Sequence, residues 1–203
     1  MKIARRRRAW ARRWQPVWRG GWLRRARCVP SPNQGVRPAD AVIDLVVVHS
    51  ISLPPGRYGS DAIERLFTNR LDARAHPAFA DLAGLQVSAH FVIRRDGELQ
   101  QFVALQGRAW HAGVSRWRGR DNCNDHSIGI ELEGLEGRTF ESVQYRRLAH
   151  LLRQIGRVLP LREVVGHEHV APGRKRDPGP GFDAARLRRR LRGSGLVLAW
   201  PAP

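Results

Sequence analysis

Hydrophobic and polar residues follow patterns that change several times along this chain. Residues 45–48 are apolar and β-branched on both faces, which is typical of a strand buried inside a parallel sheet. Two further segments, 87–93 and 127–133, alternate apolar and polar residues and predict half-buried strands. In the second, Glu131 and Glu133 face away from the apolar side. We expect Glu133 to be solvated, and the same interpretation has to be weighed for Glu131.

Apolar residues at helical spacing alternate with these strands. They predict helices at 63–71, 145–159 and 182–191. Asp96-Gly97 predicts a tight turn into a strand at 99–103, and Val164-Val165 predicts a short strand. Strands mixed with helices, without an internal repeat, predict an α/β fold: a single domain with one mixed β-sheet.

The first twenty residues differ from the rest of the chain in composition. Arginine clusters alternate there with Trp10, Trp14 and Trp18, and Trp22 continues the spacing of four. Pro16 and Gly20-Gly21 argue against one continuous amphipathic helix. We expect residues 1–20 to be a disordered basic extension, residues 21–192 to form the domain, and residues 193–203 to form a C-terminal tail. Contact of residues 1–20 with a membrane surface or a partner is the less favoured alternative.

Charge and composition narrow the function classes. The 203 residues carry a net charge of +18, but residues 1–27 hold eleven of the 36 Lys and Arg and no acid, so the remainder carries only +7. We therefore expect no specific nucleic-acid partner. No run of ~20 apolar residues is present to span a bilayer. Cys28 and Cys123 form no C-x-x-C motif, and no apolar secretory segment precedes the domain, so we expect a cytoplasmic protein.

Candidate functional residues lie at the ends of predicted strands. His49 terminates the most hydrophobic strand and opens into a loop, and His167 follows the strand at 164–165 in the same way. Asp177 comes ten residues after His167. Two imidazoles and one carboxylate match the ligand set of a catalytic zinc ion, which keeps a fourth position for water. Spacing alone does not choose between His167 and His169.

Five segments resemble, in order, the motifs of the type-2 N-acetylmuramoyl-L-alanine amidases: 47–56, 87–97, 108–113, 123–134 and 166–180. The similarity runs from about residue 22 to about residue 190. It is greatest to cytosolic members that act on 1,6-anhydro-muropeptides. It implies the peptidoglycan-recognition-protein-like fold, in which helices flank a mixed central sheet and zinc lies in a surface groove.

The resemblance also implies roles for individual residues. Its zinc ligands fall on His49, His167 and Asp177, with one Zn²⁺ per chain. Its catalytic acid–base residue falls on Glu131, and its transition-state-stabilising lysine on Lys175. Without the resemblance, Glu131 would be the exposed face of a strand and Lys175 one more solvated cation.

Three more residues are candidates for a substrate groove: Trp110, His111 and Ser50. An indole at Trp110 would stack on a sugar or peptide face, although core packing is an equal alternative for Trp110 and His111. Ser50 stands where the resemblance leads us to expect asparagine after the first ligand, which would change a hydrogen bond to substrate.

Together these features predict zinc-dependent hydrolysis of the amide between 1,6-anhydro-N-acetylmuramic acid and L-alanine in cytosolic muropeptides, during cell-wall recycling. We expect a monomer whose partner is the anhydromuropeptide. Two alternatives stay open: a periplasmic or lysin-like amidase acting on intact peptidoglycan, and a non-catalytic muropeptide-binding protein.

Overall fold

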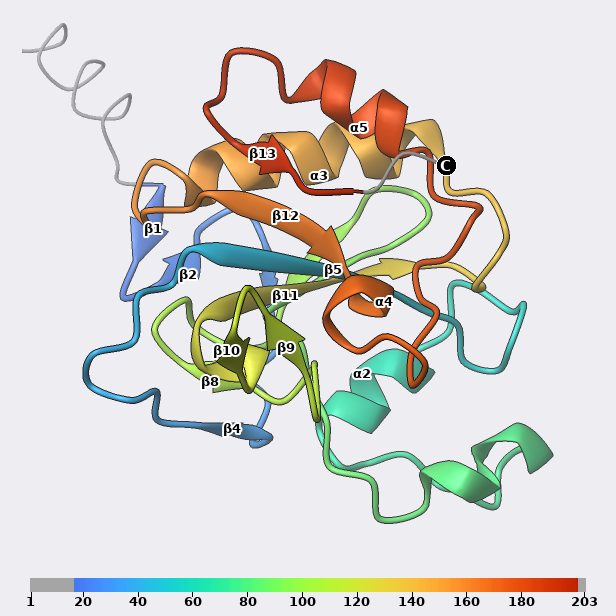
Figure 1. Ribbon diagram of the computed structural model, residues 1–203. Helices are drawn as coiled ribbons and strands as arrows, with labels where there is room; N and C mark the ends of the chain where they lie inside the picture. The colour runs from blue at the N-terminus through green and yellow to red at the C-terminus, as the bar shows by residue number, and fades with distance from the viewer. Residues whose placement is uncertain (1–16, 201–203) are drawn as a thin grey trace, which may run out of the picture.

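The computed structural model describes residues 17–200 and places a seven-stranded mixed sheet at their centre (Figure 1). The strand order is β13-β12-β5-β11-β6-β7-β3, and neighbours run parallel except for the antiparallel pair β6–β7. These strands are β3 (Arg27–Cys28), β5 (Leu45–Ile51), β6 (Phe91–Ile93), β7 (Leu99–Gln101), β11 (Ser127–Glu133), β12 (Glu163–Gly166) and β13 (Val197–Leu198). The expected α/β fold with one mixed sheet is confirmed.

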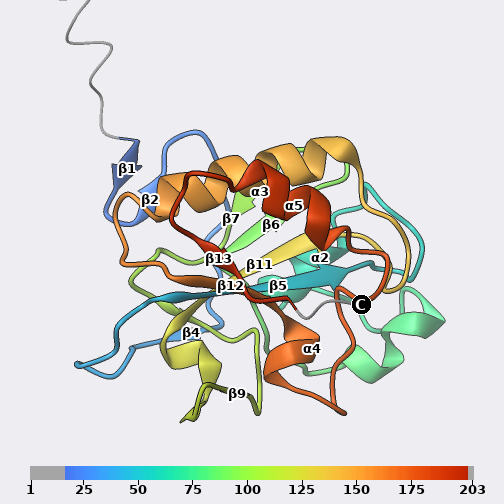
Figure 2. The ribbon, with the colours of Figure 1, turned by 45° about the horizontal axis from the view of Figure 1, so that its top comes forward.

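Helices cover both faces of the sheet, as Figures 1 and 2 show. Over one face lie α3 (Ser142–Ile155) and α5 (Ala184–Arg190), and over the other lie α2 (Ala62–Phe67) and α4 (His167–Val170). The smaller elements are β1 (Trp18–Arg19), β2 (Trp22–Leu23), β4 (Gln34–Gly35), η1 (Pro77–Leu82), β8 (Arg108–Ala109), β9 (Arg116–Trp117), β10 (Arg120–Asp121) and η2 (Cys123–Asp125). Within residues 17–200, no helix is long and apolar enough to cross a membrane.

The alternation of side chains along the central strands divides the core between the two faces. Val46 and Val48 of β5 pack in the cluster that includes Leu148 of α3, whereas Val47 packs in the cluster that includes Val170 of α4. Each fully buried aliphatic side chain of this kind contributes roughly 1.5–3 kcal/mol. The same alternation places His49, two residues after Val47, on the α4 face.

The longest helix is anchored to the sheet by one buried amide. The side-chain oxygen of Gln144 accepts the backbone N–H of Glu141 at 2.9 Å, as part of a capping box that starts α3. Its amide nitrogen donates to the backbone carbonyls of Ile93 and Glu133, at the ends of β6 and β11. The helix predicted at 145–159 is therefore confirmed, with both ends shifted toward the N-terminus.

The strand predicted at 87–93 is shorter in the structure, where β6 begins only at Phe91. Ser88 instead makes hydrogen bonds to two other segments. Its backbone N–H donates to the carbonyl of Trp110 at 3.1 Å, and its hydroxyl donates to the carbonyl of Asn33 at 2.6 Å. A serine that satisfies neighbouring backbone groups in this way competes with continuation of a ladder.

The boundary expected at residue 20 is wrong for residues 17–20. Trp18 and Trp22 lie on two antiparallel strands, β1 and β2, joined by Gly20 and Gly21 at positive φ, and not on one helical stripe. The Trp18 indole donates to the carbonyl of Gln154 and packs edge-on against the core. The disorder and surface binding predicted for the rest of the extension concern residues 1–16, which lie outside the described residues.

The expected C-terminal tail is also part of the fold as far as residue 200. β13 pairs in parallel with β12 and extends the sheet by one strand. Trp200 stacks on Phe182, with ring centroids 4.7 Å apart. A two-residue strand is too short to show alternation, so the pattern over 193–200 gave no indication of it. Residues 201–203 lie outside the described part.

Glu133 is buried, which corrects the expectation that it is solvated. Its carboxylate accepts the backbone N–H groups of Gly59 and Arg95, and it pairs with the buried guanidinium of Arg94 at 3.2 Å. The physical reason is the central position of β11, which is covered on both faces. The alternation of polar residues identified the side on which Glu133 lies but could not show that a loop covers it.

We expect Glu133→Ala to lower the free energy of unfolding by about 3–5 kcal/mol, because it leaves Arg94 buried without its partner. Urea denaturation followed by circular dichroism measures the change. Asp121→Ala is the matched control, since it breaks the exposed pair with Arg116 and should cost below about 1 kcal/mol. Equal losses of unfolding free energy in both variants would contradict the larger stabilisation assigned to the buried pair.

Candidate active site at the carboxyl ends of the central strands

The register of the central strands brings three polar side chains into one row. In the β5–β11 pair His49 lies directly opposite Glu131, and in the β5–β12 pair Val48 lies opposite Gly166. His167 is the next residue after Gly166, so it continues β12 level with His49. All three side chains therefore lie at the carboxyl ends of parallel strands, where open α/β sheets usually bind ligands.

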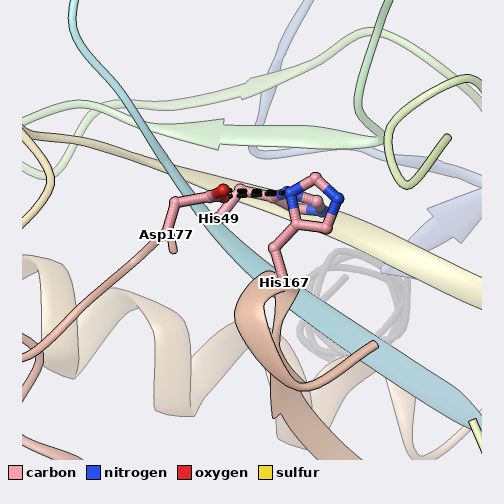
Figure 3. Close-up of side chains that lie close together, drawn as sticks. All are labelled: His49, His167 and Asp177. Carbon is pink, nitrogen blue, oxygen red and sulfur yellow. Dashed lines mark hydrogen bonds and ion pairs between the residues drawn. The ribbon is translucent and has the colours of Figure 1, made fainter. Parts of the chain in front are cut away.

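Asp177 reaches this row from the loop that follows α4. Its backbone carbonyl accepts the N–H of Glu168 at 3.0 Å, which holds the loop against the helix. Its carboxylate lies 3.1 Å from Nδ1 of His167 and 3.3 Å from Nδ1 of His49, and the two Nδ1 atoms are 3.0 Å apart (Figure 3). One donor atom from each residue thus falls within 4.8 Å of the others.

The donor chemistry of this cluster fits a metal ion. Nε2 of His167 lies 3.1 Å from the carbonyl oxygen of Ala112, which can only accept, so Nε2 carries the proton and the Nδ1 lone pair faces Asp177. Burial and the neighbouring His167 lower the pKa of His49 to about 4, so His49 is neutral at neutral pH. The third donor is the carboxylate of Asp177, which lies against both Nδ1 atoms. Two imidazoles and a carboxylate are the donors that zinc prefers.

His169 does not reach the cluster. Its Nδ1 accepts the backbone N–H of Gly166 at 2.9 Å, and its ring meets the edge of Trp200 with centroids 4.7 Å apart. It lies in the one-turn helix α4. Because His167 and His169 leave this helix on different sides, only His167 joins His49 and Asp177.

Glu131 lies beside the cluster with a carboxylate that has no fixed partner. It is 9% exposed, and its Oε2 atom is buried without a hydrogen-bond partner among the described residues. Burial and the nearby Asp177 carboxylate raise the pKa of Glu131 well above its usual value, and Lys175 opposes this effect. A buried carboxyl with a raised pKa beside a candidate metal centre is a candidate for proton transfer.

Lys175 belongs to a loop that is pinned at two points. Its own backbone N–H donates to the carbonyl of Ala171 at 2.9 Å. The guanidinium of the preceding Arg174 donates to the carbonyl of Val114 at 2.7 Å, which joins two separate loops. The positive charge of the Lys175 ammonium acts on both Glu131 and His49.

A cavity of about 480 Å³ is lined by the cluster of His49, His167 and Asp177 together with Glu131 and Lys175. The three groove candidates, Ser50, Trp110 and His111, are among its lining residues. An apolar wall on the side of α2 is formed by Leu66, Phe67, Leu82, Leu85 and Val87. The cavity can therefore hold a ligand that is polar at the cluster and apolar along one side.

One feature of the site went unforeseen in the sequence. Nδ1 of His111 lies 2.9 Å from Nε2 of His49, so His111 contacts a candidate metal ligand besides lining the cavity. Asn124, which no pattern singled out, accepts the backbone N–H groups of His111 and Ala112. No spacing rule could have shown these contacts, because they join loops far apart in the sequence.

Comparison with known proteins gives consistent results. Residues 39–180 match the family described as N-acetylmuramoyl-L-alanine amidase. The chain is 52% identical over 170 residues to the 1,6-anhydro-N-acetylmuramyl-L-alanine amidase AmpD of Escherichia coli, covering 83% of this chain and 93% of that protein.

Solved structures agree with the sequence comparison. A crystal structure of a selenomethionine AmpD derivative superposes with a TM-score of 0.82 at 50% identity, covering 85% of this chain and 97% of that chain. The E. coli amidase AmiD, in complex with the substrate anhydro-N-acetylmuramic acid-L-Ala-D-γ-Glu-L-Lys, superposes at 0.57 with 29% identity, covering 82% and 63%. A peptidoglycan recognition protein, LE, shares the fold at 12% identity, with a TM-score of 0.58 and coverage of 87% and 98%. The expected peptidoglycan-recognition-protein-like fold is confirmed.

Proposed function

Since this chain belongs to the N-acetylmuramoyl-L-alanine amidase family, we propose that it is a zinc-dependent amidase that cleaves 1,6-anhydro-N-acetylmuramic acid from L-alanine in soluble muropeptides. The observation that carries the proposal is the convergence of His49, His167 and Asp177 beside Glu131 at the end of a cavity. The similarity to AmpD over most of both chains supports the choice of substrate.

His49, His167 and Asp177 would hold the zinc ion. Bound there, zinc would supply Lewis-acid polarisation of the amide carbonyl and would acidify a water molecule. An amide resists hydrolysis because water is a poor nucleophile and an amine is a poor leaving group. The protein must therefore move a proton from the water to the departing nitrogen, as well as stabilise the charge that develops on oxygen.

Glu131 is placed to move that proton. Its unpartnered Oε2 atom would accept the proton of the attacking water, and the same carboxyl would then donate it to the nitrogen of L-alanine. The raised pKa of Glu131, caused first by burial, suits a group that must both gain and release a proton. Lys175 would place a positive charge near the developing oxyanion.

The cavity wall would bind the rest of the muropeptide. Trp110 offers an indole face on which a sugar ring or peptide plane can stack. Ser50 has a buried hydroxyl without a hydrogen-bond partner among the described residues. The complex of AmiD with an anhydromuropeptide supports a ligand of this class. A binding-only function is disfavoured because the donor set is complete.

We expect one zinc ion per chain, and loss of stoichiometric zinc in His49→Ala, His167→Ala and Asp177→Ala, because each removes one of three protein ligands. Metal analysis after dialysis measures the content. His150→Ala, an exposed histidine on α3, is the control and should retain the metal. Wild-type zinc content in all three ligand variants would place the metal elsewhere.

We expect Glu131→Gln to keep zinc and to lower kcat by about 10²–10⁴-fold, because it removes the proton acceptor without removing a ligand. Lys175→Ala should lower kcat by about 10²–10³-fold. Release of L-alanyl peptide from an anhydromuropeptide, followed by mass spectrometry, gives the rates. Arg146→Ala removes an exposed cation from α3 and serves as the control for charge. Turnover equal to wild type in Glu131→Gln would exclude Glu131 as the base.

We also propose that the enzyme acts in the cytoplasm, in the recycling of cell-wall fragments. The free thiols of Cys28 and Cys123 are consistent with a reducing compartment. An enzyme in that compartment meets soluble fragments rather than intact wall, which fits the anhydro sugar in the names of the AmpD relatives.

Fractionation of native cells and a comparison of two substrates test this placement. We expect recovery in the cytoplasmic fraction and faster cleavage of soluble anhydromuropeptide than of intact sacculi. Periplasmic recovery together with faster release from sacculi would instead support a wall-degrading amidase.

A further inference from the structure

A chain of hydrogen bonds leads away from the cluster behind His49. Nε2 of His49 lies 2.9 Å from Nδ1 of His111, and Nε2 of His111 lies 3.2 Å from the hydroxyl of Ser127. That hydroxyl donates to the backbone carbonyl of Cys123 at 2.5 Å. The chain therefore ends on a group that can only accept a hydrogen bond.

This end point fixes which atom donates in every hydrogen bond that leads back to His49. With its own proton directed at Cys123, the Ser127 oxygen accepts the Nε2–H of His111. The hydrogen-bond and aromatic contacts of the His111 ring among the described residues are with His49, Ser127 and His90 and include no carboxylate that would favour a second proton, so Nδ1 keeps a lone pair. That lone pair accepts the Nε2–H of His49, and the free lone pair of His49 is consequently on Nδ1.

Ala112, the residue after His111, accepts a hydrogen bond from the imidazole of His167 in the same way. The carbonyl of Ala112 accepts the Nε2–H of His167 at 3.1 Å, which leaves the Nδ1 lone pair of His167 toward Asp177. Two consecutive residues, His111 and Ala112, thus contact both imidazoles at their Nε2 atoms.

The position of this segment is fixed by its surroundings. The side-chain oxygen of Asn124 accepts the backbone N–H of His111 at 3.1 Å and that of Ala112 at 2.8 Å. The His111 ring lies against β11 at Gly129, where a Cβ atom would come within 2.4 Å of the ring. Any larger residue at 129 would displace the ring, so a glycine is required there.

We propose that His111 is a positioning residue that holds His49 in the Nε2–H tautomer, so that both imidazoles present Nδ1 to the metal. This inference rests on the metal site of the proposed function. The competing explanation is that His111 only lines the cavity and contacts substrate, since it is also one of the lining residues.

The test compares His111→Asn with His111→Phe in the full-length chain. Asparagine can place its side-chain oxygen near the position of Nδ1 and still accept from His49, whereas phenylalanine keeps the ring but offers no acceptor. We expect His111→Phe to weaken zinc binding by about 10–100-fold, and His111→Asn to bind close to wild type. Competition with a chromophoric chelator measures the affinity.

Nitrogen NMR of the metal-free proteins reads the tautomer directly. We expect the two ring nitrogens of His49 to show the Nε2–H form in the wild type and a mixture of tautomers in His111→Phe. A His49 protonated on Nδ1 in the metal-free wild type, or unchanged zinc affinity in His111→Phe, would overturn the proposal. If instead only KM for the muropeptide rises in His111→Phe, His111 is a substrate contact.

Two controls separate this proposal from other failures. Thermal melting of each variant without zinc shows whether it folds, and Ser127→Ala replaces His111→Phe if the latter does not. Ser127→Ala leaves His111 in place but removes the acceptor for its Nε2–H, so it should also populate the second tautomer of His49. If the wild type bound no zinc, the proposed function would fail, whereas the NMR experiment would still decide the tautomer.

Discussion

β5 is hydrogen-bonded to β11 on one side and to β12 on the other, and the register of these two pairs sets the geometry of the whole site. A shift of either neighbour by one residue would turn its side chains to the other face of the sheet. Glu131 or His167 would then leave the row that contains His49. The apolar residues of the same strands prevent such a shift, because it would expose the core under α3.

The site holds ionisable groups in a buried environment, which disfavours their charged forms. Glu131 and Asp177 are two carboxyls close to one another, and burial opposes the charge on both. Their contacts differ: the Asp177 carboxylate lies against the two imidazoles of the cluster, while the Oε2 atom of Glu131 has no hydrogen-bond partner among the described residues. Two carboxyls are thereby given different surroundings, one inside the candidate metal cluster and one beside it.

Much of the fold followed from the sequence, because β-branched runs and helical spacing are local signals. The strands around His49 and Glu131 and the helix α3 were predicted in this way. The choice of His167 over His169 needed the family resemblance, since spacing alone does not distinguish two histidines that lie two residues apart. The burial of Glu133 and the strand β13 depend on segments distant in sequence, so no local pattern could indicate them.

The packing of Trp200 has a consequence for the order in which the protein forms during synthesis. Its ring lies over Gly166, where a Cβ atom would come within 2.9 Å of it, and Gly166 immediately precedes His167. Until residues 197–200 leave the ribosome, β12 is an open edge of the sheet, and the Trp200 ring does not yet cover the residue before His167. Because the N-terminal parts of a chain emerge first, the strands of the site are available for pairing before the segment that closes their edge. The nascent chain therefore passes through a stage in which this edge can pair with other chains, and the emergence of β13 ends that stage.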